Sequence, residues 1–164
     1  NRKAPWLVGG RIFDLAGRES RGCRRRKLTL ARALGLGRWT LDRTPEPTEP
    51  VEVDAVSGAF FMMAKTQFLG LEGGFDTGYF LHVEDVDLCR RVQEAGGTVV
   101  YQPKAGALHY GATSDASPGD VARHKASSLK RYFRKFARNP LDRLANLLVL
   151  PMLEWAVVRR ARRN

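Results

Sequence analysis

The chain has few cysteines and no apolar run long enough to cross a bilayer. Its 164 residues include two cysteines, Cys23 and Cys89, which exclude a disulfide framework and match no metal motif by spacing. We therefore expect reduced thiols, a buried Cys89 and a cytoplasmic setting. The nearly apolar stretch 144–158 contains Pro151 and Glu154 and falls short of the ~20 residues that a transmembrane helix needs.

The start of the chain lacks both an initiating methionine and a secretory signal pattern. The first ten residues lead directly into a strand-like segment, so we expect the sequence to be the C-terminal part of a longer protein. No internal repeat is present. The hydrophobic content of 43% and the charged content of 27% are typical of one globular domain.

Acidic residues are scarce at both ends of the chain. The net charge is +9 over residues 1–43, −8 over residues 44–120 and +10 over residues 121–164. This distribution favours a metal or hydroxyl site in the middle of the chain and anionic surfaces as partners of the flanks.

Strand and helix signals alternate along the chain, which predicts an α/β fold. Three closely spaced prolines make residues 44–50 a linker, and Pro103 is expected to end a strand. The expected strands cover residues 6–13, 51–56, 59–64, 98–101 and 105–110. The expected helices cover residues 28–34, 65–71, 84–95 and 117–138, followed by a last helix bent at Pro151.

Three acids, Glu84, Asp85 and Asp87, fall within four residues where a loop runs into the helix expected over 84–95. Their repulsion is unfavourable unless a cation, a hydroxyl or the helix N-terminus compensates for it. The crowding predicts a chemical site; the alternative is that these are ordinary acids of a first helical turn. For Asp87, a cap or a salt bridge with Arg90 or Arg91 is the favoured interpretation.

Several short motifs follow one another in a familiar order: Val56–Ala59, Gly73–Asp76, Tyr79–Arg91, Ala95–Gly96 and Ala107–Ser114. With this order and spacing, residues 51–138 resemble the second half of family 2 glycosyltransferases of the GT-A fold, particularly the bacterial rhamnosyltransferase-like branch. The resemblance implies a partial GT-A-like mixed sheet with flanking helices. It also implies inverting transfer of a sugar, rhamnose or similar, from a nucleotide-sugar donor to a cell-envelope saccharide or lipid-linked acceptor.

The resemblance assigns roles to the acids and to one histidine. Asp85 would be the catalytic base, with Glu84 as its neighbour and a ligand of the acceptor, because the first turn of a helix stabilises a carboxylate. His109 would bind a divalent metal, Mn²⁺ or Mg²⁺, and imidazole suits Mn²⁺ better. The alternative for His109 is a half-buried histidine that is satisfied within the fold.

Further residues would bind substrate on the same resemblance. They are Ser57 and Gly58, whose backbone would lie close to the sugar, Asp76 on a sugar hydroxyl, Asp87, and Ser114 in a loop that would close over the diphosphate. Strand-end turns, a turn-forming aspartate and a plain linker are the alternatives. His82 is interpreted as structural.

The chain departs from the family pattern before residue 51, where neither a nucleotide-binding half nor an Asp-x-Asp metal motif is found. Asp85-Val86-Asp87 matches the Asp-x-Asp pattern, but it lies at the start of an expected helix, and we therefore reject it as the metal motif. We expect three regions: a basic segment with a Pro-rich linker (1–50), the acceptor-side catalytic half (51–120) and basic and apolar helices (121–164). An inactive truncated remnant of a glycosyltransferase is the alternative to an active enzyme.

The basic residues at both ends of the chain suggest surfaces that bind anionic partners. Arg24–Lys27 is either a phosphate-binding patch or, preferably, a solvated surface run. Near the C-terminus, basic residues surround an apolar row at helical spacing: Leu129, Tyr132, Phe133 and Phe136. A basic helix followed by an apolar one predicts peripheral binding to the inner face of the cell membrane. The alternatives are helices that cover the sheet, or a non-catalytic basic module for membranes or nucleic acid; we expect no nucleic-acid partner.

Overall fold

The computed structural model describes residues 5–110 and 117–161. The chain is divided into two compact units. Unit 1 falls within Asn1–Lys27, Arg38–Asp76 and Asp85–Thr113, and unit 2 falls within Leu28–Gly37, Thr77–Glu84 and Ser114–Asn164. The class is α/β, as predicted, with a mixed sheet in unit 1.

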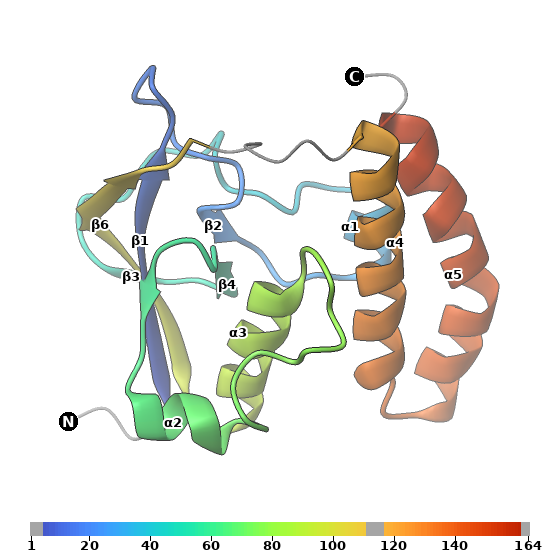
Figure 1. Cartoon of the computed structure of the whole chain (residues 1–164). Coiled ribbons are helices and arrows are strands. Elements are labelled where there is room, and N and C mark those ends of the chain that lie inside the picture. Colours follow the sequence, from blue (N-terminus) through green and yellow to red (C-terminus); the bar gives the residue numbers. More distant parts are fainter. Residues whose placement is uncertain (1–4, 111–116, 162–164) are drawn as a thin grey trace. The chain divides into compact units, whose positions relative to one another are not determined.

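The sheet of unit 1 has the strand order β3-β6-β1-β5 (Figure 1). Its centre is the parallel pair β1 (Trp6–Phe13) and β6 (Thr98–Leu108). Two short antiparallel strands, β3 (Val51–Glu52) and β5 (Phe61–Met62), flank this pair. Several side chains of the central pair are almost fully buried and form part of the core, among them Leu7, Ile12, Val99 and Tyr101.

A second, two-stranded sheet lies beside the first in unit 1. It pairs β2 (Arg24–Arg25) with β4 (Ala55–Val56) in antiparallel fashion. Gly9 of β1 allows this close approach, because a Cβ atom at that position would lie 2.5 Å from the Cβ of Val56. The helix α3 (Glu84–Glu94) lies on the same side of the main sheet as this pair (Figure 1).

Two expected strands around residue 55 are wrong in detail. Residues 51–56 do not form one strand: Val53 still donates to the Val99 carbonyl, but the chain then bends and its last two residues pair with β2 instead. The run 59–64 is not a buried strand. Only Phe61–Met62 pairs, at the sheet edge, and Met62 is 64% exposed.

Pro103 does not end a strand. β6 continues through it as one strand, and the pairing with β1 jumps from Gly10–Gln102 to Arg11–Gly106. Residues 103–105 therefore form a bulge, which is the arrangement in which proline, lacking an N–H, is tolerated within a sheet.

The expected helices are largely confirmed. In unit 1, α2 (Lys65–Gly70) and α3 lie where the pattern predicts them. In unit 2, α1 (Leu30–Leu34) begins after Thr29, whose side chain accepts from the Arg32 amide. Ser117 likewise caps α4 (Pro118–Lys135) by accepting from the Asp120 amide, as the Ser-Pro start signal predicts.

The last helix, α5 (Pro140–Ala161), packs beside α4 in unit 2 (Figure 1). The inner face of α5 buries Leu150 and Leu153, and the Asn146 side-chain amide donates to the Phe133 carbonyl at 2.7 Å. Pro151 lies inside the helix; the bend predicted there stays a prediction.

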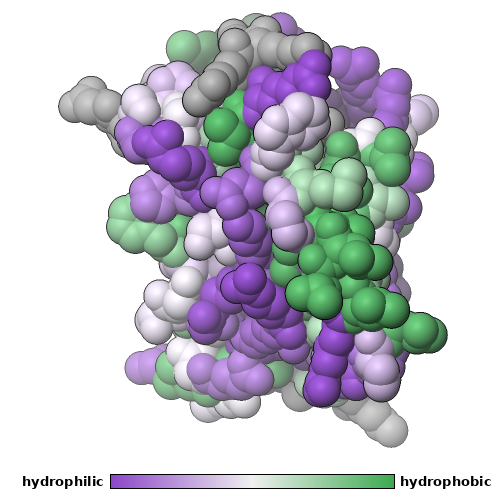
Figure 2. Space-filling view, turned by 90° about the vertical axis from the view of Figure 1, so that its right-hand side faces the viewer, coloured by the Kyte–Doolittle hydropathy of each residue, from purple (hydrophilic) through white to green (hydrophobic). Residues whose placement is uncertain are grey.

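The outer face of α5 is apolar and exposed. A green patch covers part of the face drawn in Figure 2, which is the side on which α5 lies. The exposed large apolar residues of α5 are Leu141, Leu144, Leu147, Leu148, Met152 and Trp155. Among the described residues, no helix combines the length and the apolar character needed to cross a membrane.

Candidate active site

The carboxylate of Asp85 lies in the first turn of α3 and is held by three N–H donors of unit 1. Its Oδ2 accepts from the Arg25 Nη2 at 2.6 Å and from the Gly58 amide at 3.0 Å, and its Oδ1 accepts from the Val86 amide at 2.7 Å. The side chain is 14% exposed. A carboxylate with fixed orientation and a remaining opening to solvent is suited to remove a proton from a substrate hydroxyl.

The backbone immediately before α3 is strained. His82 and Val83 have φ of 64° and 75°, in the left-handed region. A β-branched residue in that region is an outlier, and such conformations cost about 1–3 kcal/mol and concentrate at functional sites. The turn that leads into the Glu84–Asp85 pair is therefore held against its local preference.

Arg25 comes from the run Arg24–Lys27, and the expected solvated surface run is wrong for its first two members. Arg24 and Arg25 are 4% and 7% exposed, while Arg26 and Lys27 are exposed. Arg25 donates to the Val56 carbonyl as well as to Asp85, and its guanidinium lies 5.4 Å from the centre of the Trp39 ring. The two buried arginines are buried because acids and carbonyls of the fold neutralise and hydrogen-bond them.

Ser57 and Gly58, predicted to face the sugar, both lie beside Asp85. The Gly58 amide is already used by Asp85, and a Cβ atom on Gly58 would lie 3.1 Å from the Asp85 Cβ. The Ser57 hydroxyl accepts from the Ala59 amide at 3.2 Å, which makes a local turn. The structure thus brings Ser57, Gly58 and Asp85 together.

Asp87 makes the salt bridge that the sequence favoured. It is fully buried, and its Oδ1 lies 2.6 Å from the Arg91 Nε one turn later. Arg91 also donates to the carbonyls of Leu71 and Gly74, the latter at 2.7 Å. Asp87 therefore holds an arginine that ties the Gly73–Gly74 turn to α3, and we assign it no contact with substrate.

The turn that Arg91 holds carries Asp76, another predicted substrate ligand. Gly73 and Gly74 have positive φ, and a Cβ atom on Gly74 would lie 2.2 Å from the ring of Phe68. Phe75 packs edge-on against Phe68 and Phe61. Asp76 follows directly and is half-buried, so its position is fixed by a rigid turn.

His109 follows the last residue of β6 and is exposed; its amide donates to the Phe13 carbonyl at 3.0 Å. Because α3 and β6 run in opposite directions around the turn that joins them, the start of α3 and the end of β6 lie toward the same end of the sheet (Figure 1). α3 spans ~16 Å and β6 ~36 Å at ~1.5 and ~3.3 Å per residue, so β6 carries His109 well beyond the start of α3. A cleft shared by Asp85 and His109 stays a prediction.

Of the two remaining predicted site residues, Ser114 and Glu84, the structure describes only the second. Ser114 lies outside the described residues, and Glu84 is half-buried beside Asp85. Within residues 5–110 and 117–161, no three side chains of His, Cys, Asp or Glu form a group that could hold a metal ion.

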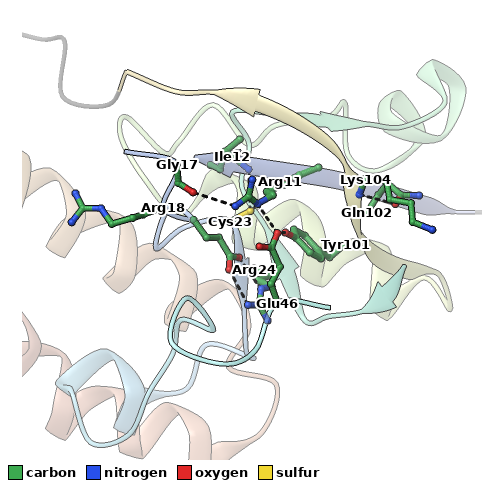
Figure 3. Close-up of polar contacts among 12 residues, drawn as sticks. Arg11, Ile12, Gly17, Arg18, Cys23, Arg24, Glu46, Tyr101, Gln102 and Lys104 are labelled. Atoms are coloured by element: carbon green, nitrogen blue, oxygen red, sulfur yellow. Dashed lines mark hydrogen bonds and ion pairs between the residues drawn. The ribbon is translucent and has the colours of Figure 1, made fainter. Parts of the chain in front are cut away.

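A partly buried polar network stabilises unit 1, and the sequence did not indicate it (Figure 3). Glu46, from the Pro-rich segment, forms an ion pair with Arg11 at 2.5 Å and accepts from the Tyr101 hydroxyl at 3.1 Å. Arg24 binds both carboxylate oxygens of Glu19. The segment predicted as a linker is thus attached to the sheet.

Both cysteines are free and buried, and the burial of Cys89 confirms the prediction from the sequence. Burial raises the pKa of Cys89 to about 12 and that of Cys23 to about 11. The Cys23 sulfur accepts from the Ile12 amide at 3.2 Å. The thiols remain protonated at neutral pH and fill space in the core.

Sequence comparison shows that the relatives of this chain are glycosyltransferases of the rhamnosyltransferase type, which confirms the resemblance seen in the motifs. N-acetylglucosaminyl-diphospho-decaprenol L-rhamnosyltransferase of Mycobacterium tuberculosis is 40% identical over 94 residues, which is 56% of this chain and 30% of the relative. Rhamnosyltransferase WbbL of Escherichia coli K12 is 36% identical over 74 residues, 43% of this chain and 28% of the relative. The chain thus spans about 30% of the length of these curated relatives.

No family model matches the chain. Among solved structures, GalNAc-T7 with UDP, GalNAc and Mn²⁺ aligns with a TM-score of 0.39 and 17% identity, over 78% of this chain and 29% of the other.

The Asp87–Arg91 pair generates a prediction about stability. Arg91→Ala leaves a buried carboxylate without its cation, so the free energy of unfolding should fall by about 3–5 kcal/mol. Arg90→Ala on the same helix removes only a partly exposed pair with Glu94 and should cost about 0.3–0.5 kcal/mol. Urea denaturation measures both; equal losses in the two variants would contradict the structural role of Arg91.

Proposed function

We propose that this chain is the acceptor-side half of an inverting glycosyltransferase. It transfers a sugar, rhamnose or similar, from a nucleotide-sugar donor to a hydroxyl of a cell-envelope saccharide or a lipid-linked acceptor. The similarity to two rhamnosyltransferases supports the class of reaction. The single observation that carries the assignment to this site is the Asp85 carboxylate, which Arg25 and Gly58 orient and which keeps 14% of its side chain exposed.

The reaction is one displacement at the anomeric carbon. The acceptor oxygen forms its bond to that carbon while the bond to the nucleoside diphosphate breaks, and the leaving oxygen keeps the electron pair. Asp85 takes the hydroxyl proton as the new bond forms, which prevents a positive charge on the acceptor oxygen. Positioned general bases of this kind contribute about 10²–10⁴-fold to the rate.

A divalent metal, Mn²⁺ or Mg²⁺, belongs to this proposal because it would neutralise the leaving diphosphate. His109 is an exposed imidazole at the end of β6 and fits as one ligand. The described residues contain no group of three potential ligands, so the diphosphate, water or residues elsewhere must complete the coordination. No step of the mechanism above is assigned to the metal.

The exposed face of α5 supports peripheral binding to a membrane, at the cytoplasmic face of the inner membrane. Leu144, Leu148, Met152 and Trp155 recur at helical spacing on the side opposite the buried Leu153. Residues 121–164 carry a net charge of +10, and Arg159 stacks on Trp155 at 4.7 Å. Apolar residues with tryptophan and arginine neighbours are typical of surfaces that insert into the interfacial layer of anionic bilayers. A lipid-linked acceptor would then be presented at the same surface.

The first test concerns Asp85 and uses the longest natural protein that contains this sequence. Asp85→Asn should lower kcat by about 10²–10⁴-fold, because the amide accepts no proton, while binding of the nucleotide sugar persists. Turnover of labelled donor and calorimetric binding measure the two effects. The exposed Asp54→Asn serves as the matched control. Unchanged turnover of Asp85→Asn would refute the base assignment, and an inactive wild type would favour a truncated remnant.

A second test concerns His109. Loss of a metal ligand by His109→Ala should raise the Mn²⁺ concentration needed for half-maximal activity by at least about 10-fold. His124→Gln, which removes an imidazole that stacks on Phe80 in unit 2, should leave the metal response unchanged. A Mn²⁺ titration of the rate compares them; an unaltered response of His109→Ala removes this residue from the metal site.

A third test concerns the apolar face of α5. The protein should co-sediment with vesicles that contain anionic phosphatidylglycerol. The double variant Leu144→Glu, Leu148→Glu should lose at least about 10-fold in binding, since a leucine that enters the bilayer contributes ~1.5–3 kcal/mol. Leu15→Glu replaces an exposed leucine in unit 1 and should bind normally. Equal binding by all three proteins would exclude α5 as the membrane contact.

A further inference from the structure

We infer that Arg25 is a positioning residue for the proposed base: it fixes the Asp85 carboxylate so that Oδ1, and not Oδ2, receives the acceptor proton. This inference rests on the proposed function, in which Asp85 is the base. It adds a second residue to the catalytic arrangement and names the atom that reacts. Neither the motifs nor the relatives assign a role to Arg25.

The hydrogen bonds of the two carboxylate oxygens differ. Each oxygen of a carboxylate has two lone-pair directions. Oδ2 uses both, for the Arg25 Nη2 at 2.6 Å and the Gly58 amide at 3.0 Å, whereas Oδ1 accepts one described hydrogen bond, from the Val86 amide at 2.7 Å. The remaining lone pair therefore belongs to Oδ1, which is the oxygen that can accept a proton without breaking a bond of the site.

Arg25 is itself held rigidly. Its Nη2 donates both to Asp85 and to the Val56 carbonyl, at 2.5 Å, and its strand β2 pairs with β4, which contains Val56. Trp39 stacks on the guanidinium. A guanidinium with fixed donors loses little entropy when it binds a carboxylate, so it orients Asp85 more firmly than a flexible side chain would.

The arginine does not reach the substrate. Its side chain is 8% exposed, and its Nε is buried with no hydrogen-bond partner in the part of the chain that the structure describes. Arg25 consequently acts through Asp85. It keeps its own proton throughout the reaction, while the substrate proton passes to Oδ1.

Arg24 provides a matched control within the same strand. Successive residues of a strand point to opposite faces. The Arg24 side chain accordingly points away from Asp85 and binds Glu19 and Thr44 in the polar network of unit 1. The two arginines are adjacent, similarly buried and each paired with an acid, but only Arg25 contacts the proposed base.

The experiment compares kcat and KM of Arg25→Ala, Arg25→Lys and Arg24→Ala in the longest natural protein, each at a temperature at which circular dichroism shows it folded. Arg25→Ala should lower kcat about 100-fold, the loss typical of a displaced reacting group, with KM for donor and acceptor within about threefold of wild type. Arg25→Lys should recover at least about 10-fold of that loss, because an ammonium can still donate to Asp85 and to Val56. Arg24→Ala should keep kcat within about threefold of wild type, since it lies outside the site.

A double variant tests whether Arg25 acts through Asp85. Arg25→Ala should cause less than about a threefold further loss in the Asp85→Asn background. A full additional loss there, or a kcat of Arg25→Ala equal to that of Arg24→Ala, overturns the inference. If Asp85→Asn has no measurable turnover, two other results decide whether Arg25 is a positioning residue. They are the loss of kcat without a change of KM in Arg25→Ala and the recovery of kcat in Arg25→Lys.

The failure of the inference and that of the proposed function remain distinguishable. An active Asp85→Asn variant refutes the base itself, whatever Arg25 does. An inactive Asp85→Asn together with a normal Arg25→Ala refutes only the positioning role.

Discussion

The ion pair between Arg25 and Asp85 is the interaction on which the candidate site depends. It joins a strand of the basic N-terminal segment to the first turn of α3, 60 positions later in the sequence. Burying the two charges costs desolvation free energy that their attraction offsets only when geometry and hydrogen bonding are good. Here the Gly58 and Val86 amides donate to Asp85 and the Val56 carbonyl accepts from Arg25, while the buried Nε of Arg25 has no hydrogen-bond partner in the described part of the chain. These bonds favour one arrangement of the segments that the pair joins.

The same principle explains the charge distribution of unit 1. Arginines of the basic first segment and of α3 turn inward and meet acids: Arg24 with Glu19, Arg25 with Asp85, and Arg91 with Asp87. Part of the positive charge that the sequence suggests for anionic ligands is therefore used inside the fold. Other arginines stay exposed on both units, among them Arg18, Arg26 and Arg38 in unit 1 and Arg131, Arg134 and Arg143 in unit 2.

Local patterns predicted the helices well because caps and glycine stops are short-range signals. Ser117 with Pro118, and the glycines after α3, mark helix ends without reference to the rest of the fold. The strands were harder to predict from the sequence. The apolar run at 59–64 and the alternation at 51–56 have the composition of strands, but strand length depends on partners, and Gly9 and the β2–β4 pair determine where pairing stops. Asp85 was found through its motif, whereas Arg25 and Glu46 were not, since a paired arginine and a surface arginine look alike in sequence.

The bulge at residues 103–105 has a consequence for the far end of β6. Side chains of a strand alternate between its two faces, so the number of residues in the bulge decides on which face every later residue emerges. Deleting or inserting one residue there would rotate His109 to the other face while leaving the pairing of Trp6 to Gly10 intact. The number of residues in this bulge thus determines which side chains at the end of β6 face each side of the sheet, although the residues themselves stay the same.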